Sequence, residues 1–254
     1  MRRKIKIGVF VLFGLTSCQQ KNDKPSQKDQ MLDIPLSVFK DTLPRAAEKS
    51  ETGKIEKSLL AAGLVNISDV DSTIVVNLKY STRDNFLNAD VYEDLEHCYL
   101  QKDVAQKLAI AQLLLKSKYP YYSLFVYDGA RPRNVQQIMW DMLKVPASEK
   151  TKYLSNPNSG SLHNFGAAVD ISIIDESGKE LDMGTRFDYF GELAYPEKEE
   201  QLNIQGKLSF QQISNRKLLR SVMNQAGFFN IETEWWHFNS CKLTAAVEKY
   251  QIIP

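Results

Sequence analysis

Residues 161–170 read Ser161-Leu162-His163-Asn164-Phe165-Gly166-Ala167-Ala168-Val169-Asp170. Gly166 and the small residues after it begin an apolar run that continues to Ile174, and such a run predicts a buried strand over residues 167–174. His163 then lies on the turn before the strand, and Asp170 lies inside it. Both side chains can point at one spot, so this stretch predicts a polar site at the start of a core strand.

A second polar motif, Glu234-Trp235-Trp236-His237, lies in a predicted strand over residues 231–238. Strand alternation would put Glu234 and His237 on opposite faces, so a shared site requires a bend or a bulge. The chain has three histidines, and two of them lie in these motifs. Two histidines and one aspartate suit zinc, and three protein ligands leave a fourth position for water, as in catalytic zinc sites. Glu234 would then be the base.

The remaining patterns predict a single compact α+β domain with a mainly antiparallel central sheet and flanking helices. Residues 73–78 and 124–127 are apolar or β-branched and predict strands. Apolar residues at helical spacing predict helices over 103–118 and 209–226, the second ending before Gly227, and a further helix is expected over 134–143. Helices and strands do not alternate strictly and Gly-rich turns are missing, which argues against a doubly wound nucleotide-binding fold.

The two polar motifs together resemble a known family. Ser-x-His-x-x-Gly-x-Ala-x-Asp followed by Glu-x-Trp-His is similar to the zinc signature of the D-Ala-D-Ala peptidases that share a fold with the Hedgehog signalling domain. The resemblance extends to residues 78–86, 128–132 and 183–188, which point to the D-alanyl-D-alanine dipeptidase branch known from vancomycin resistance. The matches run from about residue 78 to residue 238 and leave residues 1–58 uncovered.

The resemblance implies one zinc ion per chain and assigns roles to five residues. The implied zinc ligands are His163, Asp170 and His237. Glu234 is implied as the general base that takes a proton from water, and Arg131 as the arginine that stabilises the tetrahedral intermediate. These roles agree with general chemistry, because zinc activates water, a carboxylate relays its proton and a guanidinium meets the developing oxyanion.

The resemblance also implies how a small peptide would be bound. Asp188 is similar to the acidic residue that binds the substrate ammonium. Tyr80 and Tyr92 are implied as walls of the substrate pocket, and Ser161 is expected near the substrate.

The expected function is therefore zinc-dependent hydrolysis of D-Ala-D-Ala, or of a related small peptide, in bacterial cell-wall metabolism. A D,D-carboxypeptidase or endopeptidase acting on peptidoglycan would use the same metal ligands in a more open cleft. A non-catalytic protein that binds wall fragments is a further alternative. The physiological role, whether resistance, recycling or scavenging of D-alanine, is left open.

The N-terminus predicts export and lipid attachment. Four basic residues flank or precede the apolar run 7–15, which is long enough for a signal peptide and too short to span a bilayer. The run ends in Leu15-Thr16-Ser17-Cys18, which looks like a lipobox. The expected organisation is a lipoprotein signal peptide over 1–17, a lipidated Cys18 with a flexible tether over 18–58, and the catalytic domain over 59–254. An ordinary secretory signal with a chance cysteine is the alternative.

Charge and cysteine content limit the partners. The chain carries 32 Lys and Arg against 31 Asp and Glu, a net charge of +1, so nucleic acid is not an expected partner. Removal of residues 1–17 takes away four basic residues and leaves 28 basic against 31 acidic ones, a net charge of −3. Outside the cytoplasm Cys98 and Cys241 could form a disulfide or remain two buried thiols, and the sequence does not choose between them.

Overall fold

The computed structural model describes residues 53–93 and 95–254. The predicted signal peptide, Cys18 and the tether up to residue 52 lie outside this part of the chain. Helix α1 (Lys54–Ala61) begins inside the segment expected to be tether, and it buries Leu59, so the folded domain starts before residue 59. Within the described residues, none of the helices combines the length and the apolar character needed to cross a membrane.

The central sheet has five strands in the order β2-β4-β5-β7-β6. Their bounds are β2 Val75–Val76, β4 Ser123–Asp128, β5 Ala168–Ile174, β6 Phe229–Asn230 and β7 His237–Asn239. Only β2 and β4 pair in parallel, and the other pairs are antiparallel, which confirms the predicted α+β class with a mainly antiparallel sheet. All seven residues of β5 are buried, as expected for an apolar central strand covered on both faces.

Strand register brings the polar positions of three strands together. Asp170 of β5 pairs with Asp128 of β4 on one side and with His237 of β7 on the other. Side chains at directly opposed positions lie on the same face of a sheet. Three residues that are far apart in the sequence therefore project from neighbouring points of one sheet face.

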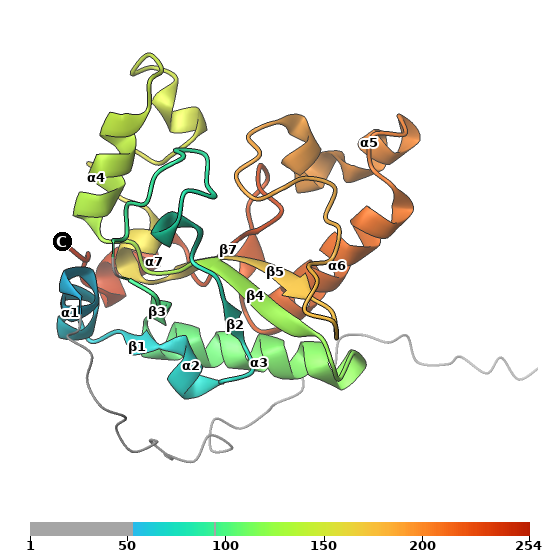
Figure 1. The fold of residues 1–254 in the computed structure, drawn as a ribbon, viewed down its shortest axis with the longest axis horizontal. Coiled ribbons are helices and arrows are strands. Elements are labelled where there is room, and N and C mark those ends of the chain that lie inside the picture. The colour runs from blue at the N-terminus through green and yellow to red at the C-terminus, as the bar shows by residue number, and fades with distance from the viewer. Residues whose placement is uncertain (1–52, 94) are drawn as a thin grey trace, which may run out of the picture. The chain divides into compact units, whose positions relative to one another are not determined.

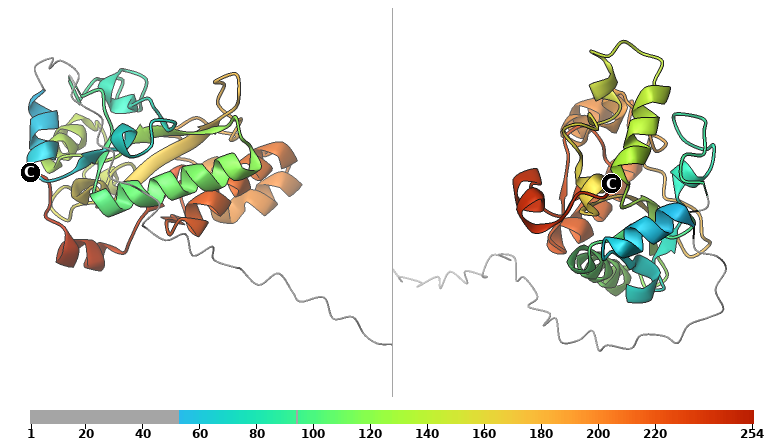
Figure 2. Two further views of the ribbon diagram at one scale, coloured as in Figure 1. Left: turned by 90° about the horizontal axis from the view of Figure 1, so that it is seen from below. Right: turned by 90° about the vertical axis from the view of Figure 1, so that its left-hand side faces the viewer.

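Helices cover this sheet, and the two longest match their predicted positions. Helix α3 (Lys102–Lys118) packs against β4 and against α6 (Phe210–Gln225), and the two helices lie along one face of the sheet (Figures 1 and 2). Ser209 caps α6 by accepting a hydrogen bond from Gln212 N, and Gly227 ends it with a φ of +86°. Helix α4 (Arg133–Met142) and the loops around the site lie on the side away from α3 (Figure 1).

Smaller elements complete the domain. A two-stranded antiparallel pair joins β1 (Val65–Asn66) to β3 (Tyr99–Leu100). The short helices are α2 Ile67–Val70, η2 Lys79–Ser81, η3 Lys150–Lys152, η4 Leu162–Phe165, η5 Glu192–Ala194, η6 Pro196–Lys198, α5 Glu199–Ile204 and α7 Leu243–Lys249.

The strand predicted over residues 231–238 is wrong for most of its length. Residues 231–236 form bends and a turn, and β7 begins only at His237. The Asn230 side chain explains the difference, because its Nδ2 donates to the carbonyl oxygens of Glu234 at 2.8 Å and His237 at 2.7 Å. These bonds satisfy the backbone without a strand ladder, and the resulting bend turns Glu234 and His237 toward the same cavity. The strand predicted over 73–78 is also shorter, reduced to Val75–Val76.

Candidate active site

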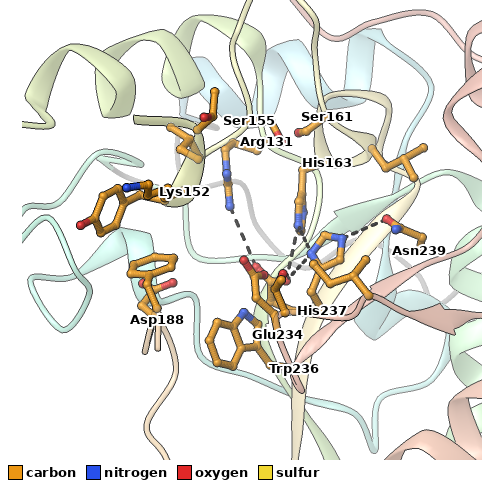
Figure 3. Close-up of a pocket in the computed structure, with 18 of the residues that line it drawn as sticks. Arg131, Lys152, Ser155, Ser161, His163, Asp188, Glu234, Trp236, His237 and Asn239 are labelled. Atoms are coloured by element: carbon orange, nitrogen blue, oxygen red, sulfur yellow. Dashed lines mark hydrogen bonds and ion pairs between the residues drawn. The ribbon is translucent and has the colours of Figure 1, made fainter. Parts of the chain in front are cut away.

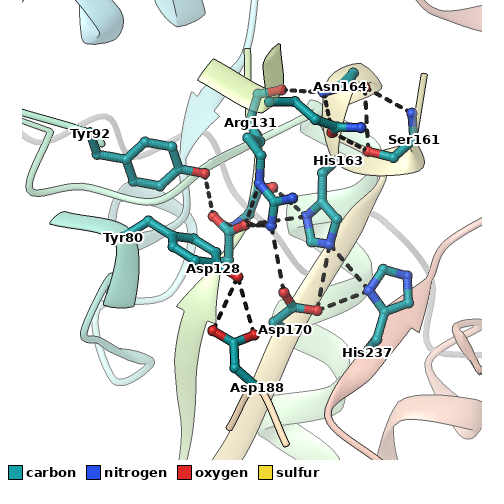
Figure 4. Close-up of polar contacts among 12 residues, drawn as sticks. Tyr80, Tyr92, Asp128, Arg131, Ser161, His163, Asn164, Asp170, Asp188 and His237 are labelled. Atoms are coloured by element: carbon teal, nitrogen blue, oxygen red, sulfur yellow. Dashed lines mark hydrogen bonds and ion pairs between the residues drawn. The ribbon is translucent and has the colours of Figure 1, made fainter. Parts of the chain in front are cut away.

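Three candidate metal ligands converge at the floor of a cavity. His163 comes from η4, Asp170 from β5 and His237 from β7, and one ligand atom from each lies within 4.8 Å of the others (Figure 4). His237 Nδ1 lies 2.9 Å from Asp170 Oδ1 and 3.2 Å from His163 Nε2. The structure thus brings together the three residues that the sequence analysis names as ligands.

The chemistry of these atoms fits a cation. His163 Nδ1 lies 2.7 Å from the carbonyl oxygen of Gly129, which can only accept, so Nδ1 carries the ring proton and Nε2 presents a lone pair. That lone pair faces a second imidazole nitrogen and a buried carboxylate oxygen. Two nitrogens and one oxygen converging in this way match the donor set of a tetrahedral zinc site with one open position.

The cavity above these residues has a volume of about 620 Å³ (Figure 3). Glu234 lines it beside His237, at the end of the bent segment 231–236. Enclosure away from solvent raises the pKa of the Glu234 carboxyl above its ordinary value, although the nearby His237 opposes the shift. A carboxyl with a raised pKa holds a proton more readily than an ordinary glutamate, which suits a group that accepts and returns one.

Arg131 lines the cavity, and its guanidinium is held by the buried Asp128. Its Nη2 and Nε donate to Asp128 Oδ2 at 2.5 and 3.1 Å, and its guanidinium lies 4.9 Å from the centre of the Tyr80 ring. Burial alone would lower the pKa of Arg131, but the charge of Asp128 raises it well above the ordinary value. The guanidinium therefore stays charged and is held in one orientation.

The opposite end of the cavity contains a second buried carboxylate, Asp188. Its backbone has a φ of +59°, a left-handed conformation that aspartate tolerates better than most residues. Tyr80 Oη donates to its two oxygens at 3.2 and 3.3 Å (Figure 4). Phe86 N donates to the same carboxylate at 3.4 Å. Burial, reinforced by the charge of Asp170, raises the pKa of Asp188 well above its ordinary value.

Comparison with known proteins identifies the family. The M15 peptidase family described as "D-ala-D-ala dipeptidase" matches residues 60–251. The chain belongs to this peptidase family. A D-alanyl-D-alanine dipeptidase of Escherichia coli (strain K12) is 31% identical over 179 residues, covering 69% of this chain and 83% of that protein. A D-alanyl-D-alanine dipeptidase of Enterococcus faecium is 26% identical over 194 residues, covering 69% of this chain and 90% of that protein.

A solved structure of the LdcB LD-carboxypeptidase is also similar in part. It is 22% identical, with a TM-score of 0.38, and the match covers 59% of this chain and 63% of that chain.

In this M15 peptidase, Tyr92 does not have the position that the sequence analysis expects. Its side chain is fully buried and lies outside the set of residues that line the cavity. Its hydroxyl donates to Asp128 Oδ1 at 2.6 Å, so the residue stands behind Arg131 (Figure 4). Tyr92 is therefore corrected from a pocket wall to a support of the Asp128–Arg131 pair. The other expected wall residue, Tyr80, does line the cavity.

Ser161 lines the cavity of the peptidase, but its hydroxyl already has a partner. It donates to Gln136 Oε1 at 2.9 Å, and the same oxygen accepts from Asn164 Nδ2 at 2.9 Å. Asn164 Nδ2 also donates to the carbonyl oxygen of Arg131 at 2.8 Å. Ser161 thus belongs to a network that links η4 to α4 and to the segment carrying Arg131.

Asp128, Gln136 and Asn239 are among the residues at or next to this site that received no role from the sequence. Asp128 had a signal, because it follows an apolar run and precedes Arg131 by three residues, a spacing at which an ion pair across a tight turn is possible. Gln136 had no comparable signal. Asn239 lies two residues after His237, where strand alternation predicts the same face.

Cys98 and Cys241 are both free thiols. The sequence allowed either a disulfide or two thiols, and the structure has two thiols. Cys98 is buried beneath Gly129, and Cys241 is half-buried.

Proposed function

We propose that this M15 peptidase is a zinc-dependent D-alanyl-D-alanine dipeptidase of bacterial cell-wall metabolism. The observation that carries the proposal is Asp188, a buried carboxylate in the same cavity as the three candidate metal ligands and Arg131. None of the ion pairs within residues 53–93 and 95–254 involves Asp188, so its carboxyl group is available to pair with a cationic group of a substrate. The names of the curated relatives support the same substrate.

The residues that would hold zinc are His163, Asp170 and His237. Zinc bound there would supply Lewis acidity, which lowers the pKa of water toward neutrality and polarises a carbonyl group.

Two residues of the chain would carry the proton and stabilise the charge. Glu234 would accept the proton of the attacking water and return it to the leaving amine, as its place in the cavity and its raised pKa favour. Arg131 would donate hydrogen bonds to the oxygen of the scissile carbonyl as negative charge develops on it. Because Asp128 fixes the guanidinium in advance, little reorganisation is needed during the reaction.

Aromatic rings lie at the end of the cavity that contains Asp188. Phe190 makes edge-to-face contacts with Phe86 and with Tyr153, both with ring centroids 5.1 Å apart. The three rings come from three separate segments and pack together beside Asp188, which accepts a hydrogen bond from Phe86 N. A peptide with a free amino group would pair with Asp188, whereas an acylated nitrogen would leave this carboxylate buried and unpaired.

The experiment that tests the function compares D-Ala-D-Ala with N-acetyl-D-Ala-D-Ala and a stem pentapeptide on the zinc-loaded protein. We expect the free dipeptide to be cleaved faster than both blocked substrates by roughly two orders of magnitude or more, since about 1.4 kcal/mol corresponds to each tenfold. Equal rates would reject the dipeptidase proposal in favour of a peptidoglycan carboxypeptidase. Turnover of none of the substrates would favour the binding protein.

Metal analysis together with the Glu234→Gln variant separates metal binding from proton transfer. Purified protein should contain one zinc per chain, and His163→Ala should lose both the metal and the activity. Glu234→Gln should keep the metal and lose most of the turnover, because the amide cannot accept the proton. A Glu234→Gln variant with unchanged turnover would refute the role of the base.

We also propose that the protein is exported and attached to the membrane through a lipid on Cys18. The basic residues, the apolar run 7–15 and the Leu15-Thr16-Ser17-Cys18 motif support this location. Cys18→Ala should release active protein from the membrane fraction. Membrane pelleting of that variant, with no lipid on the wild-type protein, would favour an ordinary secretory signal.

A further inference from the structure

Asn239 lies on the same strand as His237 and on the same face. In β7 the middle residue, Phe238, is fully buried, while the side chains of His237 and Asn239 both line the cavity. His237 Nε2 lies 2.9 Å from Asn239 Oδ1, on the side of the ring opposite to the candidate metal site (Figure 3). The ring is therefore contacted at both of its nitrogens.

The contact with Asn239 determines which nitrogen carries the proton. An amide oxygen can only accept a hydrogen bond, so Nε2 of His237 must be the donor. In the neutral ring, Nδ1 then keeps the lone pair, which faces Asp170 and His163. His163 is held in the opposite tautomer by the Gly129 carbonyl, with its proton on Nδ1. The two histidines thus present different nitrogens to the same point.

We infer that Asn239 is a positioning residue that keeps the proton of His237 on Nε2 and so makes Nδ1 available to the metal. This inference rests on the proposed zinc site.

The reason that a partner is needed lies in the distance between His237 and Asp170. Nδ1 of His237 is 2.9 Å from Asp170 Oδ1, which is a good distance for an Nδ1–H to donate to the carboxylate. Without an acceptor at Nε2, that alternative tautomer would join two of the three ligands to each other and oppose metal binding. The backbone of His237 is held separately, since its carbonyl oxygen accepts from Asn230 Nδ2. Asn239 therefore acts on the ring and not on the strand.

The test is the affinity of the metal-free protein for zinc, measured by competition with a chromophoric chelator. Asn239→Leu has a similar size but no acceptor, and we expect it to bind zinc about 10 to 100 times more weakly than the wild-type protein. Asn239→Ala should show the same loss without crowding the cavity. Asn239→Asp keeps an acceptor and should bind zinc at least as tightly as the wild type.

Controls separate this effect from a loss of structure. Asn158→Leu changes an exposed asparagine in a loop and should leave zinc affinity unchanged. The unfolding temperatures of the metal-free variants should agree, since the expected effect is on the metal and not on the fold. Unchanged affinity in Asn239→Leu and Asn239→Ala, or equal weakening in Asn239→Asp, would overturn the inference and leave the proposed function standing. A wild-type protein that binds no zinc would overturn both.

Discussion

Asp128 and Asp188 are both buried carboxylates near the same cavity, yet their surroundings differ. Asp128 is 0% exposed and accepts four hydrogen bonds at 2.5 to 3.1 Å, including two from the cation Arg131. Asp188 is 7% exposed and accepts only longer contacts, 3.2 to 3.4 Å, from Tyr80 and Phe86. A buried carboxylate with a complete set of donors stabilises its neighbours, whereas one with weak partners and no cation retains the capacity to bind a ligand.

The largest expected effect follows from removing the satisfied carboxylate. Asp128→Ala would leave Arg131 buried without its hydrogen-bonded partner and with only the Asp170 carboxylate at 4.0 Å, and breaking a buried pair typically costs about 3 to 5 kcal/mol. Turnover should fall as well, because the guanidinium loses its fixed orientation. Urea unfolding and steady-state kinetics of the zinc-loaded variant would measure both effects. If Asp128→Ala were as stable and as active as the wild type, the supporting role of this residue would be wrong.

A smaller effect is expected when the charge of Asp188 is removed. Asn tolerates the left-handed backbone at this position, so Asp188→Asn changes the charge with little strain. The preference for D-Ala-D-Ala over its N-acetyl derivative should fall by about 100-fold, or about 2.7 kcal/mol, mainly through a higher KM for the free dipeptide. The ratio of kcat/KM values for the two substrates is the measurement. A preserved ratio would exclude Asp188 as the residue that selects the ammonium.

The two tyrosines that contact these carboxylates offer a direct comparison. Tyr92→Phe removes a 2.6 Å hydrogen bond to Asp128 and should cost about 1 to 2 kcal/mol of stability. Tyr80→Phe removes only the long contacts to Asp188 and should cost less than about 1 kcal/mol. Unfolding of the two variants side by side would check the order. The reverse order would contradict the difference drawn between the two carboxylates.

The smallest expected effect is a gain in stability, caused by Asp188→Asn in the absence of substrate. Because the pKa of Asp188 is raised above its ordinary value of 3.8 in the folded protein, ionisation of this residue costs stability once the pH exceeds that value. Asp188→Asn removes the cost, so the substrate-free variant should be more stable than the wild type near neutral pH, by about 0.5 to 1 kcal/mol.

The sign can be checked by thermal unfolding at several pH values. Below about pH 4 Asp188 is protonated in both states, and the advantage of the variant should vanish. An advantage that does not change with pH would show that the charge of Asp188 is not its source.

Local patterns in the sequence were sufficient for much of the fold and for part of the site. Val104, Leu108, Ala111 and Leu115 recur at helical spacing, and all four are buried in α3. The apolar run that forms β5 was also predicted from the sequence. This prediction placed His163 on a turn and Asp170 in a strand, as the structure has them. The chemistry of these residue types suggested a zinc site before their distances were known, and the structure places the three ligand candidates together.

What the tertiary structure alone decided is the choice of partner for each polar side chain. Tyr92 bonds to a residue 36 positions away, and Tyr80 to one 108 positions away, so the number of residues between them carries no information about the contact. The bend over 231–236 likewise depends on Asn230 reaching carbonyl oxygens that only the folded chain brings near. Helical and strand periodicity arise from repeating backbone geometry and can be read along the chain. Hydrogen-bond partners depend on which elements pack together, and packing is a property of the whole domain.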